Sequence, residues 1–250
     1  MAHPKIVAVI PARLASTRLA RKPLLNETGK YLFQHVYESV ARARGLAEVV
    51  VATDSDEIVA AAKSFGANVE LTRADHTSGT DRVFEVISRR PDAEIILNIQ
   101  GDEPEVQPAD VDILIETLLN SDCDAGTVAA PCPPDRVHDN AAVKVVLDLK
   151  GRALYFSRSP IPYPRYPAAM PEGRLHLVHA GLYAFRRRTL EDFAKMTPTP
   201  LERTESLEQL RLLENGKTMA VGIIARPPVG VDTPGDYQRF VAAYRAGAIR

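Results

Sequence analysis

Short apolar strands and amphipathic helices alternate regularly over the first 120 residues, and this pattern limits the possible folds more than any other feature. Four apolar runs have the length and the β-branched content of buried parallel strands, at residues 6–10, 48–52, 68–71 and 94–99. A segment with helical spacing of its apolar residues follows each run, and Asp54 with Glu57 is expected to cap the second one. Repeated β-α units form a parallel sheet with right-handed crossovers. The pattern therefore predicts an α/β fold with a mostly parallel central sheet.

The second half of the chain predicts more strands and a proline-rich arm. Strands are expected at residues 125–130, 143–147, 153–156, 175–185 and 218–224, and helices at 199–215 and 234–246. Residues 148–151 are expected to be a turn between antiparallel strands. Residues 159–171 contain five prolines, which favour an extended arm or loop. Because no long polar linker divides the chain, we expect one domain with a β-rich elaboration in its second half.

The composition excludes several classes of protein. The formal net charge of the 250 residues is −1, which argues against a broad nucleic-acid footprint. No apolar run is as long as a membrane span, and the five apolar residues after Lys5 are too few for a signal-peptide core. Cys123 and Cys132 lack partners at zinc spacing and are interpreted as free thiols. We therefore expect a cytoplasmic protein without membrane insertion.

A cluster of cations follows the first strand. The loop at residues 11–24 holds four cationic side chains with two hydroxyls between them: Arg13, Arg18, Arg21, Lys22, Ser16 and Thr17. Such groups at the carboxyl edge of an α/β sheet are suited to a polyphosphate. Taken alone, the loop is equally well a solvated basic surface. The chain has no P-loop, no G-x-G-x-x-G after the first strand and no G-x-S-x-G, so those nucleotide-binding and hydrolase sites are not expected.

Two carboxylates are candidate metal ligands. Asp102 follows the fourth strand in the run Gln100-Gly101-Asp102-Glu103-Pro104, at the ligand edge of a parallel sheet. Asp232 precedes a helix that begins with a proline. Mg²⁺ takes one or two carboxylates and completes its shell with water and phosphate oxygens. The alternatives are that Asp102 only belongs to a turn, and that the Asp232 carboxylate only interacts favourably with the dipole of the helix that follows it.

Further polar groups fall into three sets. The loop at residues 71–82 offers hydroxyls and N–H groups to a base or an anion, or is an ordinary helix cap. On the strand at 175–185, His179, Gly181 and Tyr183 share one face, although a strand histidine is more often structural. On the helix at 199–215, Glu205, Glu208 and Gln209 are expected to form one polar face. The alternative is that this face only contacts solvent.

These motifs together resemble one enzyme family. In order along the chain they read I-P-A-R-L-A-S-T-R-L-x-x-K-P-L, A-T-D, T-R-A-D-H-T-S-G-T-D-R, N-I-Q-G-D-E-P, A-V-K-V-V, A-L-Y-F-S-R-S-P-I-P, H-x-G-x-Y, L-E-Q-L-R and V-D-T-P-x-D. From about residue 5 to residue 240 the chain resembles the 3-deoxy-manno-octulosonate (KDO) cytidylyltransferases. The resemblance implies a Rossmann-like nucleotidyltransferase fold, a homodimer, and the transfer of CMP from CTP to KDO for lipopolysaccharide synthesis, with Mg²⁺ as cofactor and pyrophosphate as product. It also implies a nucleotide-binding half at about 5–122 and a sugar-binding and dimerisation half at about 123–246.

The resemblance also assigns roles to residues. The catalytic residues would be Arg13, Lys22 and Asp102, and the metal ligands Asp102 and Asp232. The nucleotide would contact Pro11, Ala12, Arg13, Lys22, Thr72, Arg73, Ser78, Gly79 and Gln100. The sugar acid would contact Arg73, Gln100, Arg158, His179, Tyr183, Glu208 and Gln209. The arm at 159–171 would contribute to the dimer interface.

The chain departs from the family at two places. Ala20-Arg21 stands where the family usually has Pro-Gly, so the path of the first loop is in question. Ala180 replaces a bulkier apolar residue and is expected to widen the sugar pocket. Two alternatives therefore stay open: a cytidylyltransferase for a related sugar acid, such as 8-amino KDO or a sialic-type acid, and a catalytically silent homologue.

Overall fold

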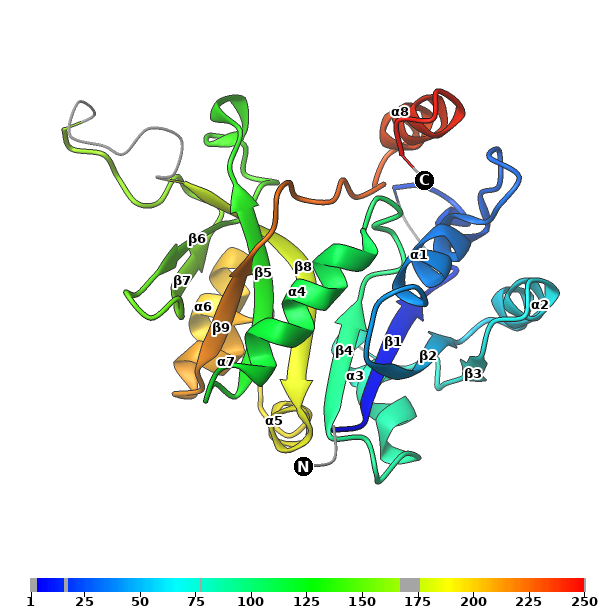
Figure 1. Cartoon of the computed structure of the whole chain (residues 1–250), viewed down its shortest axis with the longest axis horizontal. Helices are drawn as coiled ribbons and strands as arrows, with labels where there is room; N and C mark the ends of the chain where they lie inside the picture. The colour runs from blue at the N-terminus through cyan, green and yellow to red at the C-terminus, as the bar shows by residue number, and fades with distance from the viewer. Residues whose placement is uncertain (1–3, 16–17, 77, 167–175, 250) are drawn as a thin grey trace. The chain divides into compact units, whose positions relative to one another are not determined.

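The computed structural model describes residues 4–15, 18–76, 78–166 and 176–249, and the chain divides into two compact units (Figure 1). The first unit comprises residues 1–112 and 228–250, and the second comprises residues 113–227. The C-terminal segment thus belongs to the first unit, which contains both Asp102 and Asp232. Within the described ranges, no helix combines the length and the apolar composition that crossing a membrane requires.

A parallel sheet forms the centre of the first unit. Its strands are β1 (Ile6–Ala12), β2 (Leu46–Thr53), β3 (Val69–Leu71) and β4 (Ile95–Ile99), in the order β3-β2-β1-β4. All seven residues of β1 are buried, as expected of a strand covered on both faces. Because the chain reverses its direction across the sheet between β1 and β4, the carboxyl ends of these strands form a topological switch point.

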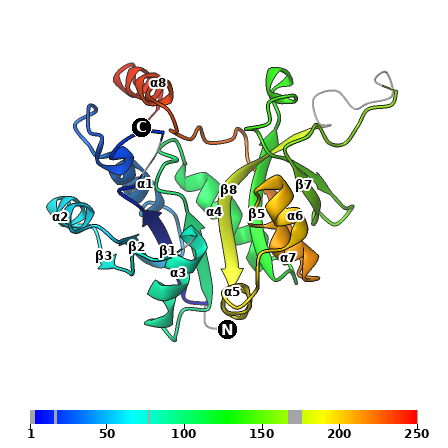
Figure 2. The same ribbon diagram turned by 180° about the vertical axis from the view of Figure 1, so that it is seen from behind.

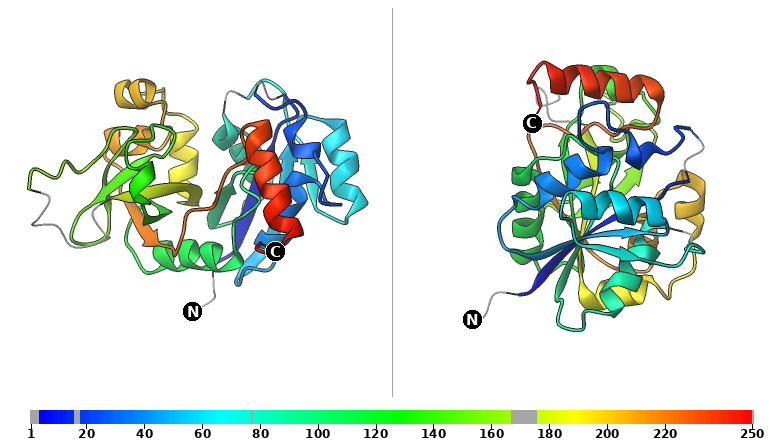
Figure 3. Two further views of the ribbon diagram at one scale, coloured as in Figure 1. Left: turned by 90° about the horizontal axis from the view of Figure 1, so that it is seen from above. Right: turned by 90° about the vertical axis from the view of Figure 1, so that its right-hand side faces the viewer.

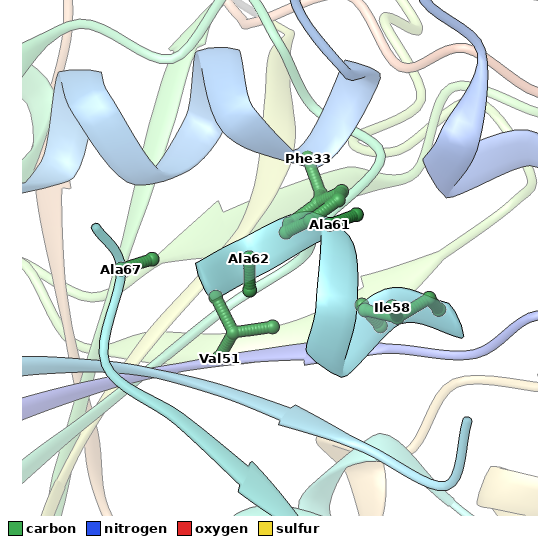
Figure 4. Close-up of a cluster of buried hydrophobic side chains, with 7 residues drawn as sticks. Phe33, Val51, Ile58, Ala61, Ala62 and Ala67 are labelled. Atoms are coloured by element: carbon green, nitrogen blue, oxygen red, sulfur yellow. The ribbon is translucent and has the colours of Figure 1, made fainter. Parts of the chain in front are cut away.

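Helices cover both faces of this sheet. α1 (Leu32–Val40) and α2 (Asp56–Ser64) lie on one face, and α3 (Gly79–Ser88) lies on the other (Figures 1 and 2). Phe33 of α1 packs with Ile58 and Ala62 of α2 over Val51 of β2 (Figure 4). These apolar contacts hold β1 and β2 in place and thereby fix the edge of the sheet from which the first loop leaves.

The C-terminal helix α8 (Pro234–Arg245) packs close to α1 (Figure 3). Phe240 contacts the ring of His35 with 5.0 Å between centroids, and Leu32 lies in the same apolar cluster. As predicted, the helix begins with a proline, and Thr233 and Asp236 form a capping box at its start.

The expected cap of α2 is wrong. The N-cap residue is Ser55, and its side chain makes no capping hydrogen bond. Asp54 instead pairs with the buried guanidinium of Arg82 at 2.6 Å, and Glu57 pairs with Arg21. Both carboxylates thus bind cations from distant segments, which a pattern of neighbouring residues does not reveal.

A mixed sheet forms the core of the second unit. β5 (Ala125–Pro131) pairs in parallel with β9 (Met219–Ile223) and antiparallel with β8 (Leu177–Arg186). The hairpin of β6 (Lys144–Leu147) and β7 (Ala153–Ser157) joins the first part of β8, and its turn lies at the predicted residues. α4 (Pro108–Leu119) starts in the first unit and packs on β9, where a Cβ on Gly222 would lie 2.8 Å from Ile113.

The prediction of one continuous helix at 199–215 is wrong. α6 (Pro200–Glu205) ends at Ser206, whose φ of 54° and ψ of 50° are left-handed, and α7 (Leu210–Glu214) begins after a short turn. Glu205, Glu208 and Gln209 therefore do not share a helical face. Within the described part of the second unit, two further short helices were not predicted, η2 (Pro134–Arg136) and α5 (Arg187–Phe193). In the proline-rich arm, residues 159–166 form neither helix nor strand, and the rest of the predicted arm lies outside the described residues.

Candidate functional site

A cavity of about 360 Å³ opens at the carboxyl ends of β1 and β4, at the switch point of the first unit. It gathers seven of the residues that the resemblance assigns to the nucleotide or the metal: Pro11, Ala12, Arg13, Lys22, Gly79, Gln100 and Asp102. Ala15, Arg18, Pro23 and Gly101 complete its lining. Ser16 and Thr17 lie outside the described residues. Residues that the resemblance assigns to one site thus line one cavity, while their roles stay predictions.

Close approach of two main-chain segments shapes the cavity. A Cβ on Gly101 would lie 3.0 Å from the carbonyl oxygen of Pro11, closer than most Cβ contacts in proteins. A Cβ on Gly79, the first residue of α3, would lie 3.5 Å from the ring of Pro11. The absence of a side chain at Gly101 therefore lets the end of β1 and the loop after β4 meet, which brings Arg13 and Asp102 to one cavity.

Lys22 lies between the two candidate metal ligands. It is the first residue of the short helix η1 (Lys22–Leu24), and its Nζ lies 2.6 Å from Oδ2 of Asp102 and 3.1 Å from Oδ1 of Asp232. The Lys22 side chain is only 12% exposed, whereas those of Asp102 and Asp232 are 37% and 44% exposed. The Val231 N–H also donates to the Asp102 carbonyl at 2.9 Å, so the two acidic segments are tied together.

The carboxylates fit a magnesium site, although not without a rearrangement. Both carboxylates contact the same nitrogen, so a single cation in its place would also reach both. Within the described residues, no group of three or more His, Cys, Asp or Glu side chains forms a metal site. Two carboxylates suffice for Mg²⁺ when phosphate and water supply the other ligands. The donor set therefore fits, provided that the Lys22 ammonium moves away.

Arg18 is a contributor to this site that the residue assignments omit. Its guanidinium lies 3.0 Å from the same Asp232 oxygen that Lys22 contacts, and it lines the cavity. The dense cation cluster of the first loop was the available signal, but nothing in the sequence singled Arg18 out within it. With Arg13 and Lys22 it makes this wall of the cavity strongly cationic.

The structure gives an explanation for Arg21. Its φ of 54° and ψ of 29° lie in the left-handed region, which favours the glycine that the family usually has at this point. Its guanidinium makes two hydrogen bonds to the carboxylate of Glu57 on α2, and these lower the pKa of that carboxyl group. The Arg21 side chain is thus directed to α2. It is not among the described residues that line the 360 Å³ cavity.

The polar loop before α3 has a more structural role in this state. Ser78 caps α3 in a reciprocal capping box with Asp81, and the Thr72 hydroxyl donates to the Thr53 carbonyl at 3.0 Å. Arg73 pairs with Asp75 at 2.6 Å and is 70% exposed. Of the described residues assigned to the nucleotide, Thr72, Arg73 and Ser78 are outside the cavity lining, whereas Gly79 and Gln100 are part of it. Thr77 lies outside the described residues.

A second cluster of predicted residues lies in the second unit. The rings of His179 and Tyr183 have centroids 5.4 Å apart, and the Tyr183 hydroxyl donates to Oε1 of Gln209 at 3.1 Å. Nε2 of His179 lies 2.8 Å from the buried hydroxyl of Thr127, and burial lowers the pKa of the imidazole to about 3. His179 is therefore neutral at physiological pH and acts as a hydrogen-bonding and packing group. Thr127, which orients it, was missed because nothing marks it in the sequence.

An irregularity in β8 brings the two rings together. In a regular strand, side chains four residues apart lie about 13 Å from each other. Tyr183 pairs with Thr127 of β5, and Ala180 pairs with Val128, the next residue of β5. The residues of β8 between Ala180 and Tyr183 therefore have no partner residue on β5. Burial still alternates along the strand, so the predicted common face of His179, Gly181 and Tyr183 is confirmed. The irregularity shortens that face and makes a compact polar cluster of it.

Glu205 and Arg158 form a network beside this cluster. The Glu205 carboxylate accepts from the Ser157 hydroxyl at 2.6 Å and the Arg158 N–H at 3.0 Å. Burial opposes ionisation of Glu205, but these hydrogen bonds outweigh it, and the pKa of the carboxyl group is lowered. The Arg158 guanidinium donates to backbone carbonyls, including that of Glu205 at 2.7 Å. Glu208 lies in the turn between α6 and α7 and is half-buried.

Comparisons with known proteins agree with these observations. The family described as Cytidylyltransferase matches residues 7–219. The 3-deoxy-manno-octulosonate cytidylyltransferase of Geobacter sulfurreducens is 49% identical over 247 residues, which cover 94% of this chain and 98% of that protein. The enzyme of the same name from Myxococcus xanthus is 44% identical over 242 residues, with 97% of each chain covered.

Solved structures give the same result. The chain is similar to CMP:2-keto-3-deoxy-manno-octonic acid synthetase complexed with CTP, with 40% identity, a TM-score of 0.92, and 97% and 99% of the two chains covered. A cytidylyltransferase from Leptospira borgpetersenii, 17% identical with a TM-score of 0.65 over 98% of this chain and 88% of that chain, shares the fold alone. The predicted nucleotidyltransferase-type α/β fold is confirmed.

Proposed function

The chain belongs to the family of 3-deoxy-manno-octulosonate cytidylyltransferases, and from this premise we propose that it transfers CMP from CTP to the anomeric hydroxyl of KDO. The products are CMP-KDO, which serves lipopolysaccharide synthesis, and pyrophosphate. One observation supports this reaction most: the cavity at the ends of β1 and β4 combines Arg13, Arg18 and Lys22 with the Asp102 carboxylate. Cations for a triphosphate and a carboxylate for its metal are what nucleotidyl transfer requires.

The cationic wall would hold the nucleotide. Arg13 and Lys22 would bind the triphosphate and stabilise the charge of the departing pyrophosphate. Pro11, Ala12, Gly79 and Gln100 would form the surface against which the nucleotide lies. Thr72, Arg73 and Ser78 are proposed for the cytidine side, which requires Arg73 to leave Asp75.

Asp102 and Asp232 would hold the cofactor Mg²⁺, which supplies charge neutralisation to the phosphates when it is bound. The Lys22 ammonium now lies between these carboxylates. If this ammonium group moved from the carboxylates to the triphosphate, it would bind the phosphates and leave both carboxylates free for Mg²⁺. Arg18, which contacts Asp232, would follow the same course.

The second cluster is proposed to bind the sugar acid. His179, Tyr183, Glu208 and Gln209 would contact its hydroxyls, with Gln100, Arg73 and Arg158 as further contacts. The anomeric hydroxyl attacks the α-phosphorus in line with the leaving pyrophosphate, and no covalent enzyme intermediate is needed. The contribution of the protein is therefore mostly positioning and electrostatic stabilisation.

Assembly and compartment are part of the same proposal. We propose a cytoplasmic homodimer without nucleic-acid partners. Two free cysteines, Cys123 and Cys132, are consistent with a reducing compartment. Tyr163 and Tyr166, which are 84% and 68% exposed in the proline-rich arm, support an interface there.

Pyrophosphate release from CTP tests this function directly. The purified protein is assayed with and without Mg²⁺ against KDO, 8-amino KDO and a sialic-type acid. We expect magnesium-dependent release with KDO and little with the other acids. Preference for another acid would move the assignment to that substrate, and no release with any acid would favour a catalytically silent homologue.

A further inference from the structure

A buried lysine in the second unit has no part in the chemistry described above. Lys144 on β6 is 0% exposed, and its ammonium donates to the backbone carbonyls of Asp139 at 2.8 Å, Ala142 at 2.5 Å and Arg158 at 2.7 Å. All three N–H donors of the ammonium are therefore used on neutral acceptors. Burial lowers the pKa of Lys144, which reflects the cost of keeping a charge inside the protein.

Arg158 extends this arrangement to three more carbonyls. Its guanidinium donates to Asn140 at 2.9 Å, Glu205 at 2.7 Å and Ser206 at 3.4 Å. The backbone N–H of Arg158 donates to the Glu205 carboxylate, and the backbone carbonyl of Arg158 accepts from Lys144. We call these two cations and the six carbonyls that they bind the carbonyl clamp.

The carbonyl clamp connects the two parts of the cluster proposed for the sugar acid, which are His179 and Tyr183 on β8 and the turn after α6. On one side, Val143, next to Lys144, accepts a hydrogen bond from the His179 N–H at 2.8 Å. On the other side, Ser206 begins the turn that carries Glu208 and Gln209. The hydrogen bond from Tyr183 to Gln209 connects β8 and this turn directly. The spacing between the β8 face and the turn is thus set by the clamp.

The turn needs such a restraint. Ser206 is a non-glycine residue in the left-handed region, a backbone conformation that is unfavourable for L-residues. α6 and α7 have only six and five residues, too few to hold a turn by themselves. If Lys144 were lost, the carbonyls of Asp139, Ala142 and Arg158 would lose its hydrogen bonds, one restraint on Arg158 would disappear, and the turn would relax.

We propose that Lys144 is a positioning residue for the sugar acid: through the carbonyl clamp it holds the turn with Glu208 and Gln209 at the working distance from His179 and Tyr183. This inference rests on the proposed function, because it assigns the cluster to the sugar acid. It predicts a selective effect of Lys144 on the sugar substrate, with the nucleotide side unaffected.

The test compares Lys144→Met with Lys150→Met. Both changes remove a lysine charge, but Lys150 is exposed in the turn of the same hairpin. The apparent KM values for KDO and CTP and the kcat are measured well below the melting temperature of each variant. For Lys144→Met we expect the KM for KDO to rise about tenfold or more while the KM for CTP changes less than about twofold, because a small misplacement of binding groups is costly. Lys150→Met should match the wild type.

Equal changes in both KM values, or an unchanged KM for KDO, would overturn the role of Lys144. A purely structural role would lower the melting temperature and the active fraction without separating the two KM values. If Lys144→Met does not fold, Ser157→Ala decides the question. It removes the 2.6 Å hydrogen bond to Glu205, and we expect a selective rise of about threefold in the KM for KDO; no selective rise would reject the proposal.

The wild-type protein separates the two possible failures. If it releases no pyrophosphate with KDO but accepts another acid, the proposed substrate is wrong, and the KM comparison is repeated with the accepted acid. If the wild type accepts KDO and the variants show no selective effect, the proposed function stands and the inference about Lys144 falls.

Discussion

The two units of this protein hold their candidate functional groups by opposite means. In the first unit, Lys22, Asp102 and Asp232 meet in ion pairs whose carboxylates are 37% and 44% exposed. In the second unit, Gln209 is 4% exposed, and Lys144 and the hydroxyl group of Thr127 are fully buried. Exposed ion pairs contribute little to stability and exchange partners readily, whereas a satisfied buried network is rigid.

The difference matches the demands of the two proposed substrates. A triphosphate with its metal brings its own charges, so the residues that receive it must be able to change partners. A sugar acid must be told apart from close analogues by shape and hydrogen bonds, which requires fixed groups. Changes to the ion pairs of Lys22, Asp102 and Asp232 should therefore alter turnover with little effect on stability, and changes to the buried network of the second unit should affect both.

The largest expected effect is that of Asp102→Ala. We expect turnover to fall at least about a thousandfold, because the variant removes a proposed metal ligand from the reacting centre. The melting temperature should stay near that of the wild type, since the carboxylate is partly exposed. Asp92→Ala, which breaks the exposed pair with Lys5, is the matched control and should leave turnover unchanged. Near-normal CMP-KDO formation by Asp102→Ala would refute the assignment.

Lys22→Ala should have the next largest effect. Loss of one preorganised charge is expected to raise the barrier by about 2–4 kcal/mol. In the absence of CTP, the same variant should bind Mn²⁺ more tightly than the wild type, because Lys22 no longer neutralises Asp102 and Asp232. Titration calorimetry measures the second effect, with Lys5→Ala as control. Weaker or equal Mn²⁺ binding by Lys22→Ala would contradict the exchange of partners.

The buried histidines predict an acid-sensitive stability in both units. Burial lowers the pKa of His35 to about 4 and that of His179 to about 3, while the unfolded chain titrates near 6.5. Between these values the unfolded state binds more protons, so the free energy of unfolding falls as the pH drops below 6.5. At pH 5.5 the loss should be about 1 kcal/mol for each histidine.

Urea unfolding at pH 7.5 and pH 5.5 measures this effect. His35→Gln and His179→Gln should each reduce the difference between the two conditions, and His138→Gln, at an exposed position, should not. An unchanged difference in either buried variant would mean that its imidazole is protonated in the folded protein.

Arg21→Gly is expected to have the smallest effect. Glycine fits the left-handed conformation of this position better, but the exposed pair with Glu57 is lost, so the two contributions to stability oppose each other. We expect little change in the melting temperature and a modest rise in the KM for CTP, because the loop that carries Lys22 loses its contact with α2. Glu57→Gln provides the matching change from the other partner. A large loss of stability in Arg21→Gly would show that the pair contributes more than exposed pairs usually do.

The first unit was largely predictable because its signals are local. The strands of the parallel sheet are short and mostly apolar, and the candidate functional residues Arg13 and Asp102 follow β1 and β4 closely. The position of Asp232 beside Asp102 was less accessible, since 130 residues separate them in the chain. The resemblance implied their proximity, and the return of α8 to the first unit explains it.

The second unit was predictable only in outline. His179 and Tyr183 were correctly placed on one face, because alternation along a strand is a local property. The break at Ser206 was not predicted, since a serine in the left-handed region has no sequence signature of its own. The roles of Lys144 and Arg158 were equally hidden, because their acceptors are backbone carbonyls, which every residue has.

By itself, the amino-acid sequence determined the α/β class, the family and the loop that carries the proposed phosphate-binding residues. These follow from apolar periodicity and from motifs of adjacent residues. Only the tertiary structure decided that Lys22 lies between Asp102 and Asp232, that Arg21 is directed to Glu57, and that a carbonyl clamp supports the sugar side. The physical reason is that ion pairs and buried hydrogen bonds depend on distances between segments that lie far apart in the chain.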